Sequence, residues 1–301
     1  MTFDTTGGAA TGEASAAPVC PRHPGTVSYV RCQRCERPVC PACQRPAAVG
    51  VQCVDCVREQ GRSVRAPRTP FGGRVTSARP VVTQSIIGIC AVAFLLQWTR
   101  PGLTDRLSFL PYEAVAEPYR FLTAAFVHSP SFLPHILLNL YALWMLGPYL
   151  EQLLGPVRFA ALYLVSALGS SVSILLLASP EGDTWVTHTV GASGAVFGLF
   201  SAIVILNRRL GRDSSAVIGV IVVNLAFGFW PGLGISWQGH LGGLVTGALV
   251  SLALSVRAPD GTATAVARRT QLQVAGLAGV LVLLVVLTVL KVVTVPSGLL
   301  A

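Results

Sequence analysis

Seven stretches of apolar residues, each close to the length of a membrane-crossing helix, constrain this chain more than any other feature. They cover residues 81–98, 132–154, 157–178, 191–207, 214–230, 238–256 and 271–293. A helix needs about 20 consecutive apolar residues to cross the hydrocarbon core of a bilayer. Only 12% of the 301 residues are charged, whereas soluble domains carry about 25%. The sequence therefore predicts an all-α, polytopic membrane protein.

The arginines predict how these helices are oriented. With a cytoplasmic N-terminus, the loops 155–158, 208–213 and 257–270 would face the cytoplasm, and each contains arginine. The short loops on the opposite side carry acidic residues or no charge. Cytoplasmic loops of membrane proteins are enriched in Lys and Arg. We therefore expect a multi-pass protein of the cell (plasma or cytoplasmic) membrane whose N-terminus is cytoplasmic.

Four pairs of metal-ligand residues precede the first apolar stretch. They are Cys20 and His23, Cys32 and Cys35, Cys40 and Cys43, and Cys53 and Cys56. Eight such ligands suit two closed, structural zinc sites. Few apolar residues lie between the pairs, so bound metal would supply the folding free energy of this segment. A disulfide framework is the alternative, although cytoplasmic proteins rarely contain disulfides. The remaining cysteine, Cys90, lies in an apolar stretch and is expected to be a packing residue.

A serine and a histidine each stand at the head of an apolar stretch. Ser193 lies in the sequence Gly-Ala-Ser-Gly, and His240 in Gly-His-Leu-Gly-Gly. At a rise of ~1.5 Å per residue, Ser193 would lie roughly 22 Å from Arg208, and His240 roughly 25 Å from Arg257. Both side chains would therefore reach a similar depth. A neutral imidazole can take the proton of a serine hydroxyl, so the two residues could act as nucleophile and base.

Each residue also has a simpler interpretation. A lone serine in a membrane helix usually packs or bonds to its own backbone, and glycines spaced four apart, such as Gly194 and Gly198, serve helix packing. A histidine inside a membrane span is rare and usually functional. Neither apolar stretch contains Asp or Glu, so a Ser-His dyad without a third member is expected.

These motifs resemble the rhomboid family of intramembrane serine proteases over about residues 118–256. The matching elements are Gly191-x-Ser193-Gly194, Gly239-His240-Leu241-Gly242-Gly243, His135-x-x-x-Asn139 and Glu151-x-x-x-Gly155. In the first loop, Tyr119-Arg120 stands where the family has Trp-Arg. The resemblance implies a rhomboid-like six-helix bundle followed by one C-terminal transmembrane helix. Lys291 near the outer end of that last helix would extend to the membrane interface.

The resemblance also implies roles for individual residues. Ser193 and His240 would be catalytic, while His135 and Asn139 would donate hydrogen bonds to the oxyanion. From the residues alone, His135 and Asn139 could equally form a polar bridge between helices. The expected packing residues of the active site are Gly191, Gly194 and Phe197. His128 is expected to order a loop, and His188 receives no role.

The order of the N-terminal pairs resembles B-box-like and related cross-brace zinc modules. In such modules the first and third pairs share one metal, and the second and fourth share the other. The resemblance implies one site made of Cys20, His23, Cys40 and Cys43, and a second made of Cys32, Cys35, Cys53 and Cys56.

We expect five segments along the chain. They are a disordered N-terminus (1–18), a double zinc-binding module (19–57), a basic linker (58–80), the rhomboid protease core (81–256), and a cytoplasmic loop with the seventh helix (257–301). The linker would lie against anionic lipid headgroups.

The leading interpretation is a serine endopeptidase that cuts transmembrane substrates in or near the bilayer through an acyl-enzyme. The zinc would be structural, with none needed for catalysis, and its module could bind a cytoplasmic protein. The alternatives are an inactive rhomboid-like scaffold for client membrane proteins, a transporter, and a membrane-tethered zinc adaptor. Five acidic residues among the eleven arginines of residues 1–79 argue against nucleic-acid binding.

Overall fold

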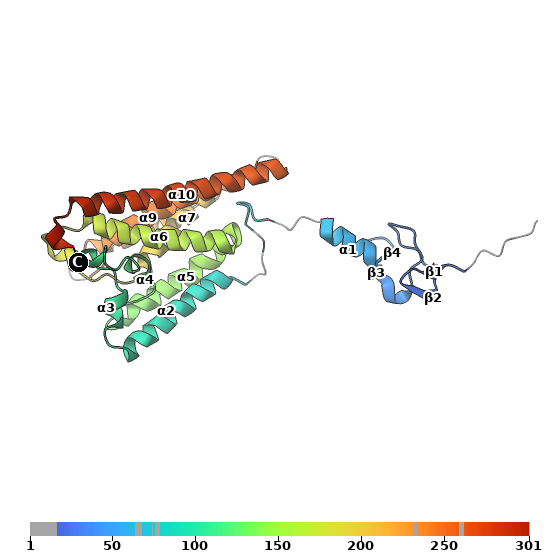
Figure 1. The fold of residues 1–301 in the computed structure, drawn as a ribbon, viewed down its shortest axis with the longest axis horizontal. Coiled ribbons are helices and arrows are strands. Elements are labelled where there is room, and N and C mark those ends of the chain that lie inside the picture. Colours follow the sequence, from blue (N-terminus) through green and yellow to red (C-terminus); the bar gives the residue numbers. More distant parts are fainter. Residues whose placement is uncertain are drawn as a thin grey trace, which may run out of the picture. The chain divides into compact units, whose positions relative to one another are not determined.

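The computed structural model describes residues 17–63, 68–73, 75, 79–230, 234–258 and 262–300 (Figure 1). The chain divides into two compact units, Met1–Ala66 and Pro67–Ala301. Residues 1–16 of the predicted disordered segment lie outside the described residues, as do residues 64–67, 74 and 76–78 of the basic linker. The two units are described in turn.

The first unit is built from short strands around buried cysteines. Strands β1 (Val19–Cys20) and β2 (His23–Val27) pair antiparallel, as do β3 (Gln44–Pro46) and β4 (Val51–Cys53). A 3-10 turn, η1 (Pro41–Cys43), precedes β3, and helix α1 (Val54–Ser63) follows β4. The buried core consists of six cysteines and Val39. The core of this unit therefore buries little apolar surface.

The second unit is a helical bundle. Its long helices are α2 (Val81–Thr99), α5 (Leu133–Leu154), α6 (Pro156–Leu177), α7 (Ser193–Arg209), α8 (Ser215–Gly228), α9 (Trp237–Leu254) and α10 (Ala263–Thr294). Its short helices are α3 (Leu103–Leu107), α4 (Arg120–Thr123), η2 (Pro111–Glu113), η3 (Asp183–Trp185) and η4 (Ser297–Leu299). One long helix lies in each of the predicted apolar stretches, which confirms the predicted helical fold.

Among the described residues, α2, α6 and α10 are long and apolar enough to cross a membrane by length and composition, and α8 is a shorter apolar helix. Helix α10 begins eight residues before the predicted position, at Ala263, because Thr262 caps it by accepting a hydrogen bond from the Ala265 N–H. The polar first turns of α10 therefore extend the helix beyond its apolar part.

Helices α6, α7 and α9 form the centre of the bundle, with α10 along one side and the α2–α5 pair along another (Figure 1). Glycines set the spacing between α7 and α9. A Cβ atom on Gly243 would lie 1.8 Å from the Gly194 carbonyl oxygen, and one on Gly247 would lie 2.3 Å from the Gly198 Cα. Small residues thus bring the two helix backbones into direct contact.

Glu151 of α5 joins this bundle to the start of α2. Its buried carboxylate accepts hydrogen bonds from the backbone N–H groups of Val82 and Thr83, at 3.0 and 2.9 Å, and from the Thr83 hydroxyl at 2.8 Å. The carboxylate therefore caps the N-terminus of α2 from a neighbouring helix, and its negative charge suits the helix dipole there.

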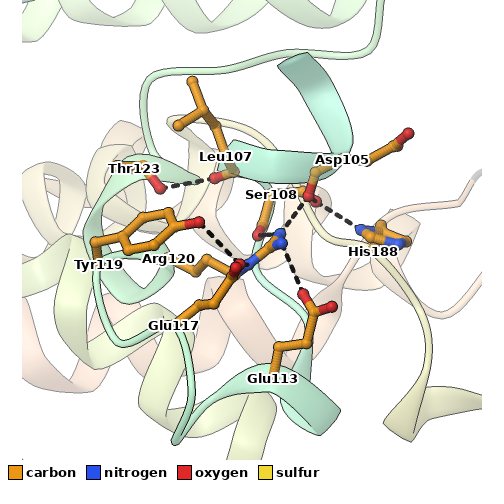
Figure 2. Close-up of polar contacts among 9 residues, drawn as sticks. All are labelled: Asp105, Leu107, Ser108, Glu113, Glu117, Tyr119, Arg120, Thr123 and His188. Atoms are coloured by element: carbon orange, nitrogen blue, oxygen red, sulfur yellow. Dashed lines mark hydrogen bonds and ion pairs between the residues drawn. The ribbon is translucent and has the colours of Figure 1, made fainter. Parts of the chain in front are cut away.

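Arg120 organises the long loop between α2 and α5 (Figure 2). Its guanidinium pairs with Glu113 at 2.7 Å and with Glu117 at 2.5 Å. It also donates to the carbonyl oxygens of Asp105 and, at 3.0 Å, Ser108. Hydrogen bonds from Tyr119 and Arg120 hold the pKa of Glu117 below its usual range. One buried side chain thus holds four parts of the loop together.

The same loop is tied to the segment that leads into α7. The Ser108 hydroxyl lies 2.6 Å from Nδ1 of His188 (Figure 2). Phe109 and Thr189 exchange two backbone hydrogen bonds of 2.8 Å each. His188, for which no role was predicted, therefore helps to fix the position of the residues before Ser193.

Lys291 joins the C-terminal end of α10 to the end of α6. Its ammonium group donates to the carbonyl oxygens of Leu176 and Ala178, at 3.2 and 2.8 Å, and lies 5.8 Å from the ring centroid of Trp185. The carbonyls at the end of a helix have no partner within it, so Lys291 caps the C-terminus of α6. That its ammonium group lies at the membrane interface stays a prediction.

The contact between α7 and α9 can be tested by a glycine-to-alanine substitution, which adds one methyl group. Gly247→Ala should lower the thermal unfolding midpoint in detergent, because overpacking costs typically about 1–3 kcal/mol. Gly279→Ala in α10 is the matched control, since its added Cβ would meet nothing within 4 Å. Equal midpoints for the two variants would contradict the described packing.

The loop offers a second test. Arg120→Met should lower the unfolding midpoint and speed proteolysis of the 100–131 loop, because charge-assisted hydrogen bonds contribute about 1.5–3 kcal/mol. Arg106→Met, which removes an exposed arginine of the same loop, should change neither property. A loop equally resistant to protease in both variants would show that Arg120 does not order it.

Candidate active site and metal-binding module

Ser193 is the first residue of α7, and a tight turn at Gly191 precedes it. Gly191 has φ of +125°, which favours glycine, and its N–H donates to the Ala124 carbonyl at 2.9 Å. A Cβ atom on Gly191 would lie 2.5 Å from Nε2 of His135. The first N–H groups of a helix have no partner within the helix. The turn therefore leaves both the Ser193 hydroxyl and its backbone N–H at the head of α7.

His240 reaches Ser193 from the first turn of α9. The distance from His240 Nε2 to Ser193 Oγ is 2.9 Å, and His240 is only 8% exposed. The start of α9 is fixed by Ser236, whose side chain accepts a hydrogen bond from the Gly239 N–H at 3.3 Å. The structure thus brings together the two residues that the sequence singled out.

Phe197 holds the imidazole of His240 in place. The two rings stack with centroids 4.2 Å apart and an angle of 16° between their planes. Nδ1 of His240 is buried and has no hydrogen-bond partner in the described part of the chain. Ring stacking therefore orients this histidine, and no carboxylate among the described residues bonds to its Nδ1.

His135 approaches the same site from α5. Its Nδ1 accepts a hydrogen bond from the Ser129 N–H at 3.4 Å, so its proton resides on Nε2, the atom next to Gly191. The Asn139 side chain is buried and donates to the His135 carbonyl at 2.8 Å. The structure places a donor of His135 beside the turn that precedes Ser193, and Asn139 one turn further along the helix.

His128 also borders this site. It is fully buried, and its ring lies edge-on to that of His135 with centroids 5.3 Å apart. Its Nε2 accepts a hydrogen bond from the Ala192 N–H at 3.5 Å. Burial lowers the pKa of His128 to about 3, which keeps it neutral and able to accept. The sequence predicted that His128 orders a loop. The structure shows in addition that His128 contacts Ala192, the residue before Ser193.

The metal-ligand candidates form two groups in the N-terminal unit. One contains Cys20, His23, Cys40 and Cys43, and the other Cys32, Cys35, Cys53 and Cys56; within each, the ligand atoms lie within 4.8 Å of one another. These are the two sets that the cross-brace order implies. All eight cysteines of the chain are free thiols, and Cys90 lies apart from both groups, buried in α2.

The spacing of the ligand atoms fits a tetrahedral ion. Zn–S bonds near 2.3 Å separate two sulfurs of a tetrahedral site by about 3.8 Å. Sγ of Cys35 and Cys53 are 3.8 Å apart. Nδ1 of His23 lies 3.2 Å from Sγ of Cys40 and 3.4 Å from that of Cys43. Both groups could therefore hold a metal ion.

Backbone N–H groups support these sulfurs. The Cys53 N–H donates to Sγ of Cys32 at 3.2 Å, and the Cys56 N–H donates to Sγ of Cys53 at 3.3 Å. Such bonds favour the thiolate form that binds metal. With four ligands each, the two groups suit structural sites, since catalytic zinc sites keep a coordination position open.

The helical unit is similar in sequence to known proteins. The Rhomboid domain family matches residues 115–257. "Rhomboid protease GluP" of Bacillus subtilis (strain 168) is 29% identical over 192 residues, which is 60% of this chain and 36% of that protein. "RHOMBOID-like protein 5" of Arabidopsis thaliana is 34% identical over 148 residues, 47% of this chain and 45% of that protein. "Putative rhomboid protease YdcA" of Bacillus subtilis (strain 168) is 29% identical over 147 residues, 46% of this chain and 68% of that protein.

The chain thus spans less than half the length of the first two of these relatives. The matched region contains Ser193, His240, His135 and Asn139, and the metal-binding module precedes it. From the match, the relatives and the apolar helices, this chain is a membrane protein that contains a rhomboid domain at residues 115–257.

Proposed function

We propose that this protein is an intramembrane serine endopeptidase. The observation that carries the proposal is the 2.9 Å contact between His240 Nε2 and Ser193 Oγ, buried in a bundle whose helices are apolar. Two of its relatives are named as rhomboid proteases, one of them putatively. An inactive scaffold for client membrane proteins would not need this contact, so the pairing favours the enzyme.

The reaction would proceed through an acyl-enzyme. His240 takes the proton of Ser193 as Oγ attacks the substrate carbonyl carbon, and then gives that proton to the leaving amine. Water, activated by the same imidazole, hydrolyses the ester. Because Nε2 must accept the serine proton, the ring proton of His240 would reside on Nδ1.

Preorganised donors would stabilise the tetrahedral oxyanion. The N–H of Ser193 is one, since it stands at the start of α7. Nε2–H of His135 is the second, because Nδ1 already accepts from Ser129. Asn139 has two amide protons, of which one is bound to the His135 carbonyl, so the other would complete the set.

Substrates would be transmembrane segments of other proteins, entering sideways from the bilayer. Helix α8 is suited to admit them, because Ile221 is its only buried residue and most of its other apolar side chains are exposed. We place the protein in the cell membrane with the N-terminal unit in the cytoplasm and the active site opening on the opposite side, in line with the arginine-rich loops.

The metal-binding module would hold two structural zinc ions. Its four-ligand sites leave no open position for catalysis, and none of its ligands belongs to the unit that contains Ser193. A cytoplasmic protein is the proposed partner of this module.

The nucleophile is tested by labelling with a fluorophosphonate probe and by cleavage of a model transmembrane substrate. Ser193→Ala and His240→Ala should abolish labelling and reduce cleavage by at least about 10³-fold. Ser201→Ala is the control, because this buried serine of α7 bonds only to the Gly198 carbonyl. Cleavage that persists in Ser193→Ala would exclude the proposed mechanism, and a folded parent protein without either activity would favour the scaffold.

The metal content is tested on the purified full-length chain by elemental analysis. We expect about two zinc ions per chain, and about one after Cys43→Ser or Cys53→Ser, since each substitution removes a ligand from a different group. Cys90→Ser should keep both ions. Strong chelators should expose the 19–57 segment to protease, and a chelated segment that stays resistant would argue against metal-dependent folding.

A further inference from the structure

The bundle end opposite Ser193 contains a buried arginine that the proposed reaction does not use. Arg269, in the second turn of α10, is 7% exposed. Its Nε and Nη2 are buried and have no hydrogen-bond partner in the described part of the chain. Burying an unpaired charged donor is costly, so this guanidinium requires an explanation.

The two unpaired atoms are those that bind oxyanions. Nε–H and Nη2–H lie parallel on one edge of a guanidinium and can grip two oxygens of a phosphate at once. A single unpaired nitrogen would offer no such geometry. The orphaned edge of Arg269 therefore points to a ligand with two adjacent negatively charged oxygens.

Two further arginines, Arg158 of α6 and Arg68, lie near Arg269. The positive charges of Arg269 and Arg68 both repel that of Arg158, and the charge of Arg68 also repels that of Arg269. Arg158 is held in place by donating to Oε1 of Gln273 at 3.0 and 2.9 Å. The ion pairs of the described residues involve only Arg22 and Arg120. Among the described residues, none of these three arginines forms an ion pair with a carboxylate.

A short segment closes over the cluster. Residues 68–73, here called the strap, form a turn in which Thr69 and Gly73 exchange hydrogen bonds. Phe71 is fully buried, and its carbonyl accepts from Gln273 at 3.0 Å. A Cβ on Gly72 would lie 2.4 Å from Cζ of Arg269. The strap therefore rests directly on the guanidinium and shields it from solvent.

The positive surface continues beside the strap. A cavity of about 380 Å³ is lined by Arg209, Leu252, Ser255, Val256 and Arg257. Arg257 lies over the Phe71 ring, 5.7 Å from its centroid, and the Val256 carbonyl accepts from Gln273 at 3.3 Å. An anion that approaches this end of the bundle would meet arginines on both sides of Phe71.

We propose that Arg269, Arg158 and Arg68 form a binding site for a phosphate group, which Arg269 grips through Nε and Nη2. The phosphate belongs to an anionic lipid headgroup or is free in solution, since both present the same oxygens. Because the strap covers the gripping edge, the strap shifts to admit the phosphate.

The experiment measures thermal unfolding of the full-length protein in nanodiscs of pure phosphatidylcholine. One arm adds inorganic phosphate, with chloride at equal ionic strength as the reference, and the other replaces part of the lipid by phosphatidylglycerol. We expect the midpoint to rise by roughly 3–8 °C in at least one arm. A rise with phosphatidylglycerol alone identifies the headgroup, and a rise with inorganic phosphate identifies a soluble ligand.

Arg269→Met is the decisive variant. It removes an unpaired buried charge, so its midpoint in pure phosphatidylcholine should equal or exceed that of the parent, and the rise with anion should vanish. Arg268→Gln, an exposed neighbour, should keep the full rise. Arg68→Gln removes an exposed charge, together with its hydrogen bond from Nη1 to the Gly72 carbonyl at 3.1 Å, and should weaken the anion's effect at least about tenfold in concentration.

Two results would overturn the proposal. One is a parent protein whose midpoint responds to neither anion. The other is a rise that persists in Arg269→Met, since that rise would come from general charge screening. Native mass spectrometry of the parent and of Arg269→Met, counting retained phosphatidylglycerol, gives a readout independent of stability.

Discussion

The backbone contact between α7 and α9 is the constraint on which the membrane unit depends. Without side chains at Gly194, Gly198, Gly243 and Gly247, the two helices meet closely enough for a hydroxyl at the head of one to touch an imidazole at the head of the other. Larger residues would separate the pair by the width of a methyl group. The proposed nucleophile and base are thus held together by van der Waals packing far more than by their own hydrogen bond.

The helices were predicted from the length and apolarity of the seven stretches. Similar depth and the rarity of polar groups in membrane spans singled out Ser193 and His240, but their pairing rested largely on the resemblance to rhomboid proteases. His135 and Asn139 followed only from family resemblance. The contacts of His188, Lys291 and Arg269 escaped prediction. Ser108 and His188 are 80 residues apart, Lys291 binds backbone carbonyls that leave no pattern in the sequence, and Arg269 resembles any other arginine of a basic loop.

The two units differ in the residues that they bury. The helical unit buries large apolar side chains such as Trp185, Tyr163 and Phe159. The N-terminal unit buries cysteines and Val39, which is too little apolar surface to offset chain entropy. The four ligand pairs were readable from spacing alone, because the chemistry of a metal site is local in sequence. The loop network around Arg120 has no such signature, since its partners include backbone carbonyls and carboxylates with no fixed spacing.

The strap has a consequence for the order of assembly. Phe71 and the Gln273 side chain that binds its carbonyl are 202 residues apart. At about 5–20 residues per second, roughly 10–40 s of synthesis separate them. Until α10 has been made and inserted, the chain preceding α2 lacks this anchor. The Phe71 carbonyl can therefore form its hydrogen bond to Gln273 only after the last helix of the bundle, α10, is in place.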